Sequence, residues 1–174
     1  MADNLRIAWS GEPRRAPELA DFFAGNVGPE YISHSELQGP RALSPDRWAE
    51  NLRELLRAEL EPRLHDTGAR APAATSRPVA IVEADAGIAA LALVTFAGGA
   101  PVPFAVIEDL VVAPAQRSRG IGKALMDWIA AEARARGIYR LFLESGKNNH
   151  RAHHFFEREG FETCSIVMMR SLAP

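Results

Sequence analysis

One stretch of the chain, residues 111–123, constrains the fold more than any other. An apolar run is followed by a polar loop and then by a helical pattern that opens with glycines at positions 120 and 122. Glycines there remove side chains where the helix begins, so the unpaired N–H groups of its first turn can face an anion. The helix dipole, Arg117 and Arg119 add positive charge beside them. The pattern predicts a strand–loop–helix unit that binds phosphate through its backbone.

Spacing separates three kinds of phosphate-binding loop. A P-loop requires a glycine five positions before its Gly-Lys pair and a serine or threonine after it, but Arg117 and Ala124 stand there. A dinucleotide-binding loop requires a third glycine where this chain has Leu125. What remains is Arg-x-x-Gly-x-Gly over residues 117–122, which resembles the pyrophosphate loop of the GNAT family of acetyl-CoA-dependent N-acetyltransferases.

A second region resembles the same family. Asn149-x-x-Ala152-x-x-Phe155-Phe156-x-x-x-Gly160-Phe161 is similar to the downstream motif in which the asparagine helps to hold the pantetheine arm and the next helix packs beside it. Residues 107–112 resemble the family's fourth strand, and the histidine after Ala152 matches a variant found among members that acetylate small amines. The resemblance covers residues 104–161, extends weakly to the preceding strands and leaves the N-terminal third almost unmatched.

The resemblance implies an α/β (α+β) fold. Its central sheet would be mixed but mostly antiparallel, with about six to seven strands, splayed between the fourth and fifth strands and flanked by about four helices. Residues 1–174 would form one domain, with a variable acceptor side in 1–78 and an acetyl-CoA-binding core in 79–174. Acetyl-CoA would be the cosubstrate. The residues implied to hold it are Leu110, Val111, Val112, Arg117, Ser118, Arg119, Gly120, Ile121, Gly122, Lys123, Asn149, Ala152, Phe155 and Phe156.

Hydrophobic periodicity predicts the individual elements. Helices are expected over residues 16–24, from Ser44-Pro45-Asp46 to near Pro62, over 120–136 with Gly137 as a left-handed terminator, and over 149–158. Strands are expected over 5–9, 79–83, 87–96, 104–112, 139–144 and 161–170. The single cysteine, Cys164, is expected as a small core residue of the last strand.

Acetyl transfer to an amine needs a base, because a free alkyl amine has a pKa near the lysine value of about 10.4. Three carboxylates are candidates, with Glu108 first, then Glu144 and Asp109. On strict alternation Glu108 shares a face with Leu110 and Val112, whereas Asp109 lies on the opposite face. Alternation does not choose between them.

Breaking the thioester releases a thiolate, which a general acid in the site can protonate. The family's common proton donor is a tyrosine at the second position of the aromatic pair, where this chain has Phe156, which carries no proton to donate. His153 shares a helix face with Asn149 and Phe156 and is the expected substitute. Alternatively, the thiolate leaves unassisted. The resemblance, through the family's splayed fourth and fifth strands, implies that backbone N–H groups of residues 110–112 polarise the thioester carbonyl.

Composition limits the partners. A net charge of −2 argues against nucleic acid, and the longest apolar runs, such as residues 88–94, are too short to cross a membrane. The single cysteine excludes a disulfide within the chain and a cysteine metal cluster, so no metal is expected. No export signal is visible, which makes the cytoplasm the expected location.

The predicted activity is direct acetyl transfer to a primary amine of a small molecule. Tyr31, His34 and Asp109 are the expected acceptor contacts, and a homodimer is the expected assembly. Two other functions stay open. One is a non-catalytic acyl-CoA-binding or regulatory module, and the other is acetylation of a protein N-terminus or lysine.

Overall fold

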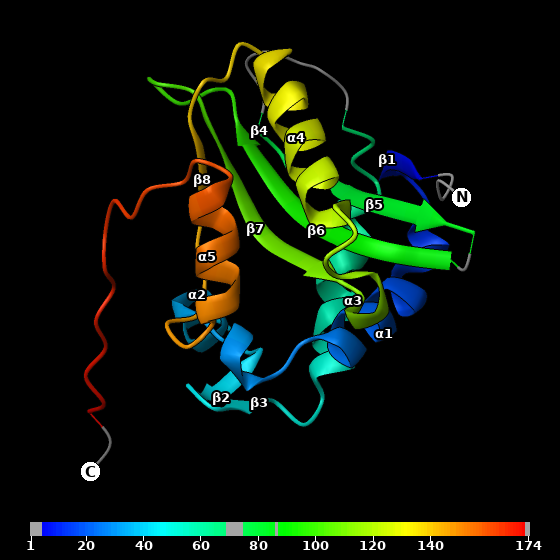
Figure 1. The fold of residues 1–174 in the computed structure, drawn as a ribbon. Helices are drawn as coiled ribbons and strands as arrows, with labels where there is room; N and C mark the ends of the chain where they lie inside the picture. The colour runs from blue at the N-terminus through cyan, green and yellow to red at the C-terminus, as the bar shows by residue number, and fades with distance from the viewer. Residues whose placement is uncertain (1–4, 69–74, 86, 173–174) are drawn as a thin grey trace.

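A mixed sheet forms the centre of the computed structural model, which describes residues 5–68, 75–85 and 87–172 (Figure 1). The main path of the sheet is β1 (Arg6–Ser10), β5 (Val79–Ala84), β6 (Gly87–Ala97), β7 (Phe104–Val112) and β8 (Leu141–Leu143). The short β4 (Thr75–Ser76) also pairs with β6, and β2 (Ala42–Ser44) and β3 (Arg47–Trp48) form a separate two-stranded sheet. Pairing is parallel between β7 and β8 and antiparallel in the other described pairs. The predicted mixed, mostly antiparallel sheet is confirmed.

Helices cover both faces of this sheet. On one face lie α1 (Ala16–Asn26) and α3 (Leu52–Arg63), and on the other lie α4 (Ile121–Arg134) and α5 (His150–Arg158). A short helix, α2 (His34–Gln38), sits near the β2–β3 hairpin. Three 3₁₀ turns connect elements of the described chain, at Pro13–Arg15, Pro29–Tyr31 and Pro114–Gln116.

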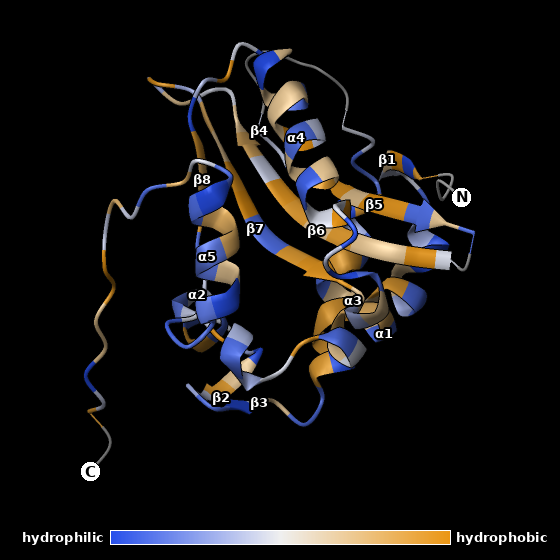
Figure 2. Cartoon of the chain, viewed as in Figure 1, coloured by the Kyte–Doolittle hydropathy of each residue, from blue (hydrophilic) through white to orange (hydrophobic). Residues whose placement is uncertain are grey.

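The apolar run predicted as a strand forms β6, the strand that is buried on both faces. Its residues 89–94 are buried without interruption, because helices cover both faces of the strand (Figure 2). Ala90, Ala92 and Val94 belong to the core under α4, whereas Leu91 and Leu93 belong to the core under α1 and α3. The continuous apolar run thus reflects burial on both sides.

Helix α4 forms where its spacing predicted. Its buried positions recur at intervals of three and four: Ile121, Leu125, Met126, Ile129 and Ala133. The helix begins after Gly120 and is followed by Gly137, whose positive φ of 73° is the left-handed conformation expected of a terminator.

A β-bulge in β7 overturns one prediction. In the pairing with β6, Leu93 lies opposite Asp109 and Val94 lies opposite Ile107, so Glu108 is the extra residue. The bulge breaks alternation, and the side chains of Glu108 and Asp109 both point to the face covered by α3. The prediction that these two carboxylates lie on opposite faces was wrong.

Two element predictions were also wrong. Residues 44–46 do not start a helix but connect β2 and β3, where the Ser44 hydroxyl donates to Asp46, and helix α3 begins eight residues after Ser44 at Leu52. Residues 162–172 form no strand and are all exposed, so Cys164 lies at the surface and not in the core. The predicted strand is absent because no strand of the described chain pairs with these residues.

Candidate active site

The sheet opens between β7 and β8. Their parallel pairing joins residues 105–107 to residues 141–143 and stops at Ile107 and Leu143. The second half of β7, which pairs with β6 over residues 109–112, runs on past the end of β8. This is the predicted splay between the fourth and fifth strands of the family fold, and two cavities adjoin this edge.

The larger cavity has a volume of about 610 Å³. It lies between the end of β7, the loop and first turn of α4, helix α5, and the segment that follows α1. Its principal lining residues are Asn26, Glu30, Tyr31, Leu110, Val111, Val112, Arg117, Ser118, Gly120, Ile121, Gly122, Lys123, Asn149, His150, Arg151, Ala152, Phe155, Phe156, Arg158 and Glu159. The structure therefore gathers the predicted loop and the predicted downstream motif around one space.

The loop that precedes α4 has an unusual backbone. Ser118 and Gly120 both have positive φ, of 63° and 81°, and Gly120 is the N-cap of the helix. Positive φ at a serine is strained, and such strain concentrates at ligand-binding sites. A Cβ atom on Gly122 would lie 3.4 Å from the ring of Phe155 and 3.6 Å from Val112 Cγ2, so a methyl group fits beside them but a larger side chain must extend into the cavity.

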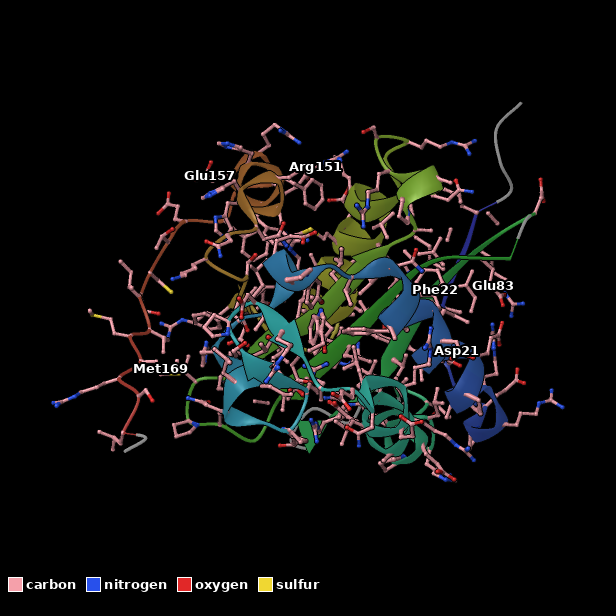
Figure 3. All side chains as sticks on the ribbon, turned by 90° about the horizontal axis from the view of Figure 1, so that it is seen from below. Asp21, Phe22, Glu83, Arg151, Glu157 and Met169 are labelled. Carbon is pink, nitrogen blue, oxygen red and sulfur yellow. The ribbon has the colours of Figure 1, made fainter. Side chains whose placement is uncertain are left out.

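The cationic side chains at this cavity hold its walls together. Arg117 donates to the carbonyl of Val112 and to that of Asn26, at 3.1 Å each, which ties the loop to β7 and to the end of α1. Lys123 binds Glu159 at 2.8 Å. The predicted cofactor residue Arg119 is not among the described residues that line the cavity and donates to Gln116. On α5, Arg151 (Figure 3) reaches to 3.5 Å from the Ser118 hydroxyl.

Helix α5 supplies the opposite wall. The Asn149 side-chain oxygen caps the helix by accepting the N–H of Ala152. Phe155 and Phe156 line the larger cavity and contact each other with ring centres 5.5 Å apart. His153 is absent from the described residues that line either cavity, so the structure does not bring it together with the other predicted site residues.

The smaller cavity, of about 40 Å³, shares a wall with the larger one. Five residues line both: Tyr31, Leu110, Asn149, Ala152 and Phe156. Three carboxylates also line the smaller cavity: Glu36, Glu108 and Glu144. The two spaces therefore meet at the open edge of β7. The charged residues that line the larger cavity are mostly cations, whereas the described charged residues that line the smaller one are all carboxylates.

The Glu108 carboxylate already has hydrogen-bond partners. It accepts hydrogen bonds from Arg63, whose side chain is buried, and from the Thr95 hydroxyl at 3.0 Å. Burial raises the pKa of Glu108, but the charge and hydrogen bond of Arg63 and the hydrogen bond of Thr95 outweigh it, so the pKa lies below its ordinary value. At neutral pH Glu108 is an ionised, paired carboxylate.

Asp109, which is buried, pairs beside it with the half-buried Tyr31. Asp109 accepts from the Tyr31 hydroxyl and from Arg41, each at 3.0 Å, and the Tyr31 oxygen accepts the backbone N–H of Leu110 at 3.0 Å. Burial raises the pKa of Asp109 to about 7, opposed by Arg41 and reinforced by the nearby charge of Glu36. Burial, together with the charge of Asp109, also raises the pKa of Tyr31 well above its ordinary value.

Glu144 has a different environment. It accepts from the Ser33 hydroxyl at 2.9 Å and lies 3.1 Å from His34 Nε2, and its side chain is 26% exposed. None of the arginine contacts made by Glu108 and Asp109 recurs at Glu144 among the described ion pairs. Of the three candidate bases, Glu144 is the one accessible from the smaller cavity without an arginine partner.

Several site residues went unnoticed in the sequence. Glu36 and Arg41 are both buried and bind each other at 2.8 Å, and Arg63 pairs with Glu108 from the far end of α3. The contacts of Arg41 with Asp109 and of Arg63 with Glu108 join segments 68 and 45 positions apart, which no local pattern indicates. One signal was available: Ser33-x-x-Glu36 is a capping box, and it starts α2 in the structure.

Comparison with known proteins decides the family. Residues 43–161 match the model of the acetyltransferase (GNAT) family. The chain belongs to the GNAT family. Among curated GNAT relatives, streptothricin acetyltransferase of Streptomyces lavendulae is 39% identical over 101 residues, which are 58% of this chain and 52% of that protein. Aminoalkylphosphonate N-acetyltransferase of Salmonella typhimurium is 38% identical over 66 residues, 38% of this chain and 43% of that protein.

Solved structures support the same fold. A Bacillus halodurans protein superposes with a TM-score of 0.70 at 16% identity, covering 96% of this chain and 99% of that one. An aminoglycoside N-acetyltransferase in complex with CoA gives a TM-score of 0.67 at 15% identity, covering 99% and 98%. At these identities the likeness concerns the GNAT fold. The chain spans about half the length of the curated relatives it matches.

The described residues contain neither a group of side chains arranged for a metal ion nor a helix suited to cross a membrane. No group of three or more histidine, cysteine, aspartate or glutamate side chains in this part of the chain is arranged to hold a metal ion. No helix within the same residues has the length and apolar character to span a membrane.

Proposed function

We propose that the protein is an acetyl-CoA-dependent N-acetyltransferase that transfers the acetyl group directly to a primary amine of a small molecule. One observation carries the proposal: a large cavity over a glycine-rich helix start meets a small acidic cavity at the unpaired edge of β7. The first suits a long phosphorylated ligand and the second suits a cationic amine. The names of the curated GNAT relatives, both acetyltransferases of small molecules, support the same class.

The residues around the larger cavity fit acetyl-CoA. The N–H groups of the first turn of α4, near Gly120 and Gly122, would hold the diphosphate, with Arg151 and Arg158 supplying charge. The edge of β7 at residues 110–112 and the side chain of Asn149 would hold the pantetheine arm. Bound there, acetyl-CoA supplies the acetyl thioester.

We assign the base to Glu144. It takes one proton from the ammonium group of the acceptor, after which the amine nitrogen attacks the carbonyl carbon. As the C–S bond breaks, the nitrogen loses its second proton to give the amide, and the thiolate takes up one proton to give the thiol. Glu108 has a lowered pKa and is held by Arg63, which makes it a weaker base and fits it to a structural and charge-attracting role. His34, beside Glu144, offers a route by which the proton reaches solvent.

We assign the acid to Tyr31. Its hydroxyl lies at the junction of both cavities and contacts the Leu110 N–H, the group expected to polarise the carbonyl. The hydroxyl donates its hydrogen to Asp109 and would turn that hydrogen to the sulfur once the thiolate charge forms, and its raised pKa keeps it protonated at neutral pH. This role takes the place of the tyrosine missing at Phe156, and His153 has no contact with either cavity that would favour it.

Thiol release from acetyl-CoA tests the proposal. We expect release with small primary amines and little with peptides or without an acceptor. Release with peptides alone would favour a protein acetyltransferase, and binding of acetyl-CoA with no release for any acceptor would favour a non-catalytic module. Both results contradict the proposal.

We further expect one domain with an acceptor side (1–78) and a cofactor core (79–174). We also expect a cytoplasmic location and neither nucleic acid nor membrane partners. The division is not sharp in the structure, because Asn26 and Tyr31 also line the larger cavity.

A further inference from the structure

The hydroxyl of Ser33 lies between two carboxylates of the smaller cavity. Its oxygen is 2.6 Å from Glu36 Oε2 and 2.9 Å from Glu144 Oε1. A serine hydroxyl carries one hydrogen, so it donates to one of these two oxygens at a time. The other contact becomes a hydrogen bond only when that carboxylate carries a proton and donates it to the serine oxygen. The geometry therefore suits two carboxylates that hold one proton between them.

The surroundings of the two carboxylates decide which of them takes that proton. Glu36 is 2% exposed, and it already accepts the backbone N–H of Ser33 at 2.7 Å and Arg41 Nη2 at 2.8 Å. These donors suit an ionised carboxylate, which only accepts hydrogen bonds. Glu144 is more exposed and lines the cavity, and its described ion pairs include no arginine. The proton therefore belongs on Glu144, the assigned base.

A close approach of two backbone segments brings Ser33 to Glu144. A Cβ atom on Gly146 would overlap the carbonyl oxygens of Glu30 and Ile32, so only glycine lets these segments touch. The touching residues directly precede Ser33 on one side and follow Glu144 by two positions on the other. Ser33 is also fixed as the N-cap of α2, where its oxygen accepts a backbone N–H of the helix. Accepting this N–H leaves the hydroxyl hydrogen free to donate to a carboxylate.

We propose that Ser33 is a positioning residue that supports the base in both of its states. While Glu144 is ionised, the Ser33 hydroxyl donates to it. When Glu144 takes the proton of the acceptor's ammonium group, its new O–H donates to the Ser33 oxygen, and the Ser33 hydroxyl turns to Glu36. The hydroxyl rotates without losing its hydrogen, so the only proton transferred is the one that passes from nitrogen to Glu144. The proposal rests on the proposed function, which makes Glu144 the base.

Other charged or titratable groups also face these three side chains. They are His34 on α2, Arg41 after α2, Glu59 on α3, Tyr31 and Glu108 around the same cavity, and Asp109, which binds Tyr31. His34 lies on the Glu144 oxygen away from Ser33, and Arg41 lies on the Glu36 oxygen away from Ser33. Removing the Ser33 hydroxyl therefore costs one hydrogen bond while Glu144 is ionised and two once it is protonated.

The pH dependence of kcat/KM tests this role. Ser33→Gly removes the hydroxyl at an N-cap, where glycine is tolerated, and should move the acidic limb of the profile down by about one pH unit. The plateau should fall by about 3- to 10-fold, because the base is weaker. Ser33→Thr keeps a hydroxyl and should keep the wild-type limb. So should Ser35→Ala, whose hydroxyl makes no hydrogen bond to either carboxylate among the described ones. An unmoved limb in Ser33→Gly, or an equal shift in Ser33→Thr, would overturn the proposal.

Carbon-13 NMR of the glutamate carboxyl groups tests the same role without turnover. Glu36→Gln and Glu144→Gln assign the two signals in the full chain. In the wild type and in Ser33→Thr, the Glu36 carbon should shift at the pH where Glu144 takes its proton, because the hydroxyl turns to Glu36 at that step. Ser33→Gly should lose this shared step. A wild type that acetylates amines without the shared step would overturn the role of Ser33 alone, whereas a shared step with no acetylation of any amine would support that role and contradict the proposed function.

Discussion

The two cavities that meet at the edge of β7 are built in opposite ways. The larger one is formed mainly by two continuous stretches, 110–123 and 148–159, and most of its charged lining residues are cations. The smaller one joins Ser33, Glu36, Glu108 and Glu144, from segments up to 111 residues apart, and its charged groups are acids. A phosphate site can be encoded locally because the helix start itself supplies the donors. An acceptor site depends on side chains that only the fold assembles.

The acids around the acceptor side outnumber their partners. Glu36, Glu59 and Asp109 surround Arg41, while Glu59 and Glu108 surround Arg63. Four carboxylates therefore share two buried guanidinium groups, and this excess is one cause of the raised pKa of Asp109. The same excess attracts a cationic acceptor.

The largest expected effect is a loss of activity on changing Glu144, which distinguishes this carboxylate from Glu108. Glu144→Gln should lower kcat/KM at pH 7 by about 100- to 1000-fold, because a general base typically contributes about 100- to 10,000-fold. The loss should shrink as the pH approaches the amine pKa, where the acceptor deprotonates itself. Rates measured from pH 6.5 to 10 check this.

Glu108→Gln is the matched control for that variant. It should leave much of the turnover but lower the free energy of unfolding by about 1–3 kcal/mol, because the buried Arg63 loses a charged acceptor. If Glu108→Gln shows the pH-dependent rate loss and Glu144→Gln does not, the base is Glu108, as the sequence first favoured.

On the cofactor side, Gly122→Val should weaken acetyl-CoA binding by about 100-fold or more. Its Cβ fits against Phe155 and Val112, but the added methyl groups extend into the space where the phosphates would approach the helix. Calorimetry measures the affinity. Gly25→Val, at an exposed helical glycine with open space around it, should bind normally, and an equal affinity of both variants would remove the diphosphate from this loop.

A smaller effect is expected where the cavities meet. Tyr31→Phe should lower kcat by about 10- to 100-fold with little change in acetyl-CoA affinity, since a thiolate needs less acid assistance than an alkoxide. Its packing against Phe23 and Trp48 is retained. Adding Phe156→Tyr should restore part of the rate, which a packing defect would not allow, and His153→Phe should be nearly silent. A large loss in His153→Phe would return the acid to that histidine.

The smallest effect concerns stability and pH. Asp109 holds its proton to about pH 7 in the folded chain, whereas a free aspartate loses it near 3.8. Between these values the folded state binds more protons than the unfolded state, so this group's contribution to stability falls as the pH rises from about 4 to 7. Asp109→Asn should flatten that fall in urea unfolding, and the exposed Asp21→Asn (Figure 3) should not. An unchanged slope in Asp109→Asn would contradict the raised pKa.

The contrast between the larger cavity, built from local stretches, and the smaller cavity, assembled by the fold, explains which site residues the sequence could predict. Gly120, Gly122 and Asn149 sit in local patterns whose periods and caps identify the helix starts, and the structure places them on one cavity. The β-bulge at Glu108 depends on pairing with β6, so strict alternation misplaced the carboxylate. Arg41 and Arg63 reach their partners across 68 and 45 positions, a range over which one sequence gives no signal.

A crystal structure with CoA bound tests the central claim most directly. We expect the diphosphate within hydrogen-bond distance of the N–H groups near Gly120 and Gly122. We also expect the sulfur at the junction of the cavities, close to the Tyr31 hydroxyl and facing Glu144. A diphosphate bound elsewhere, or a sulfur that points away from the acidic cavity, would contradict it.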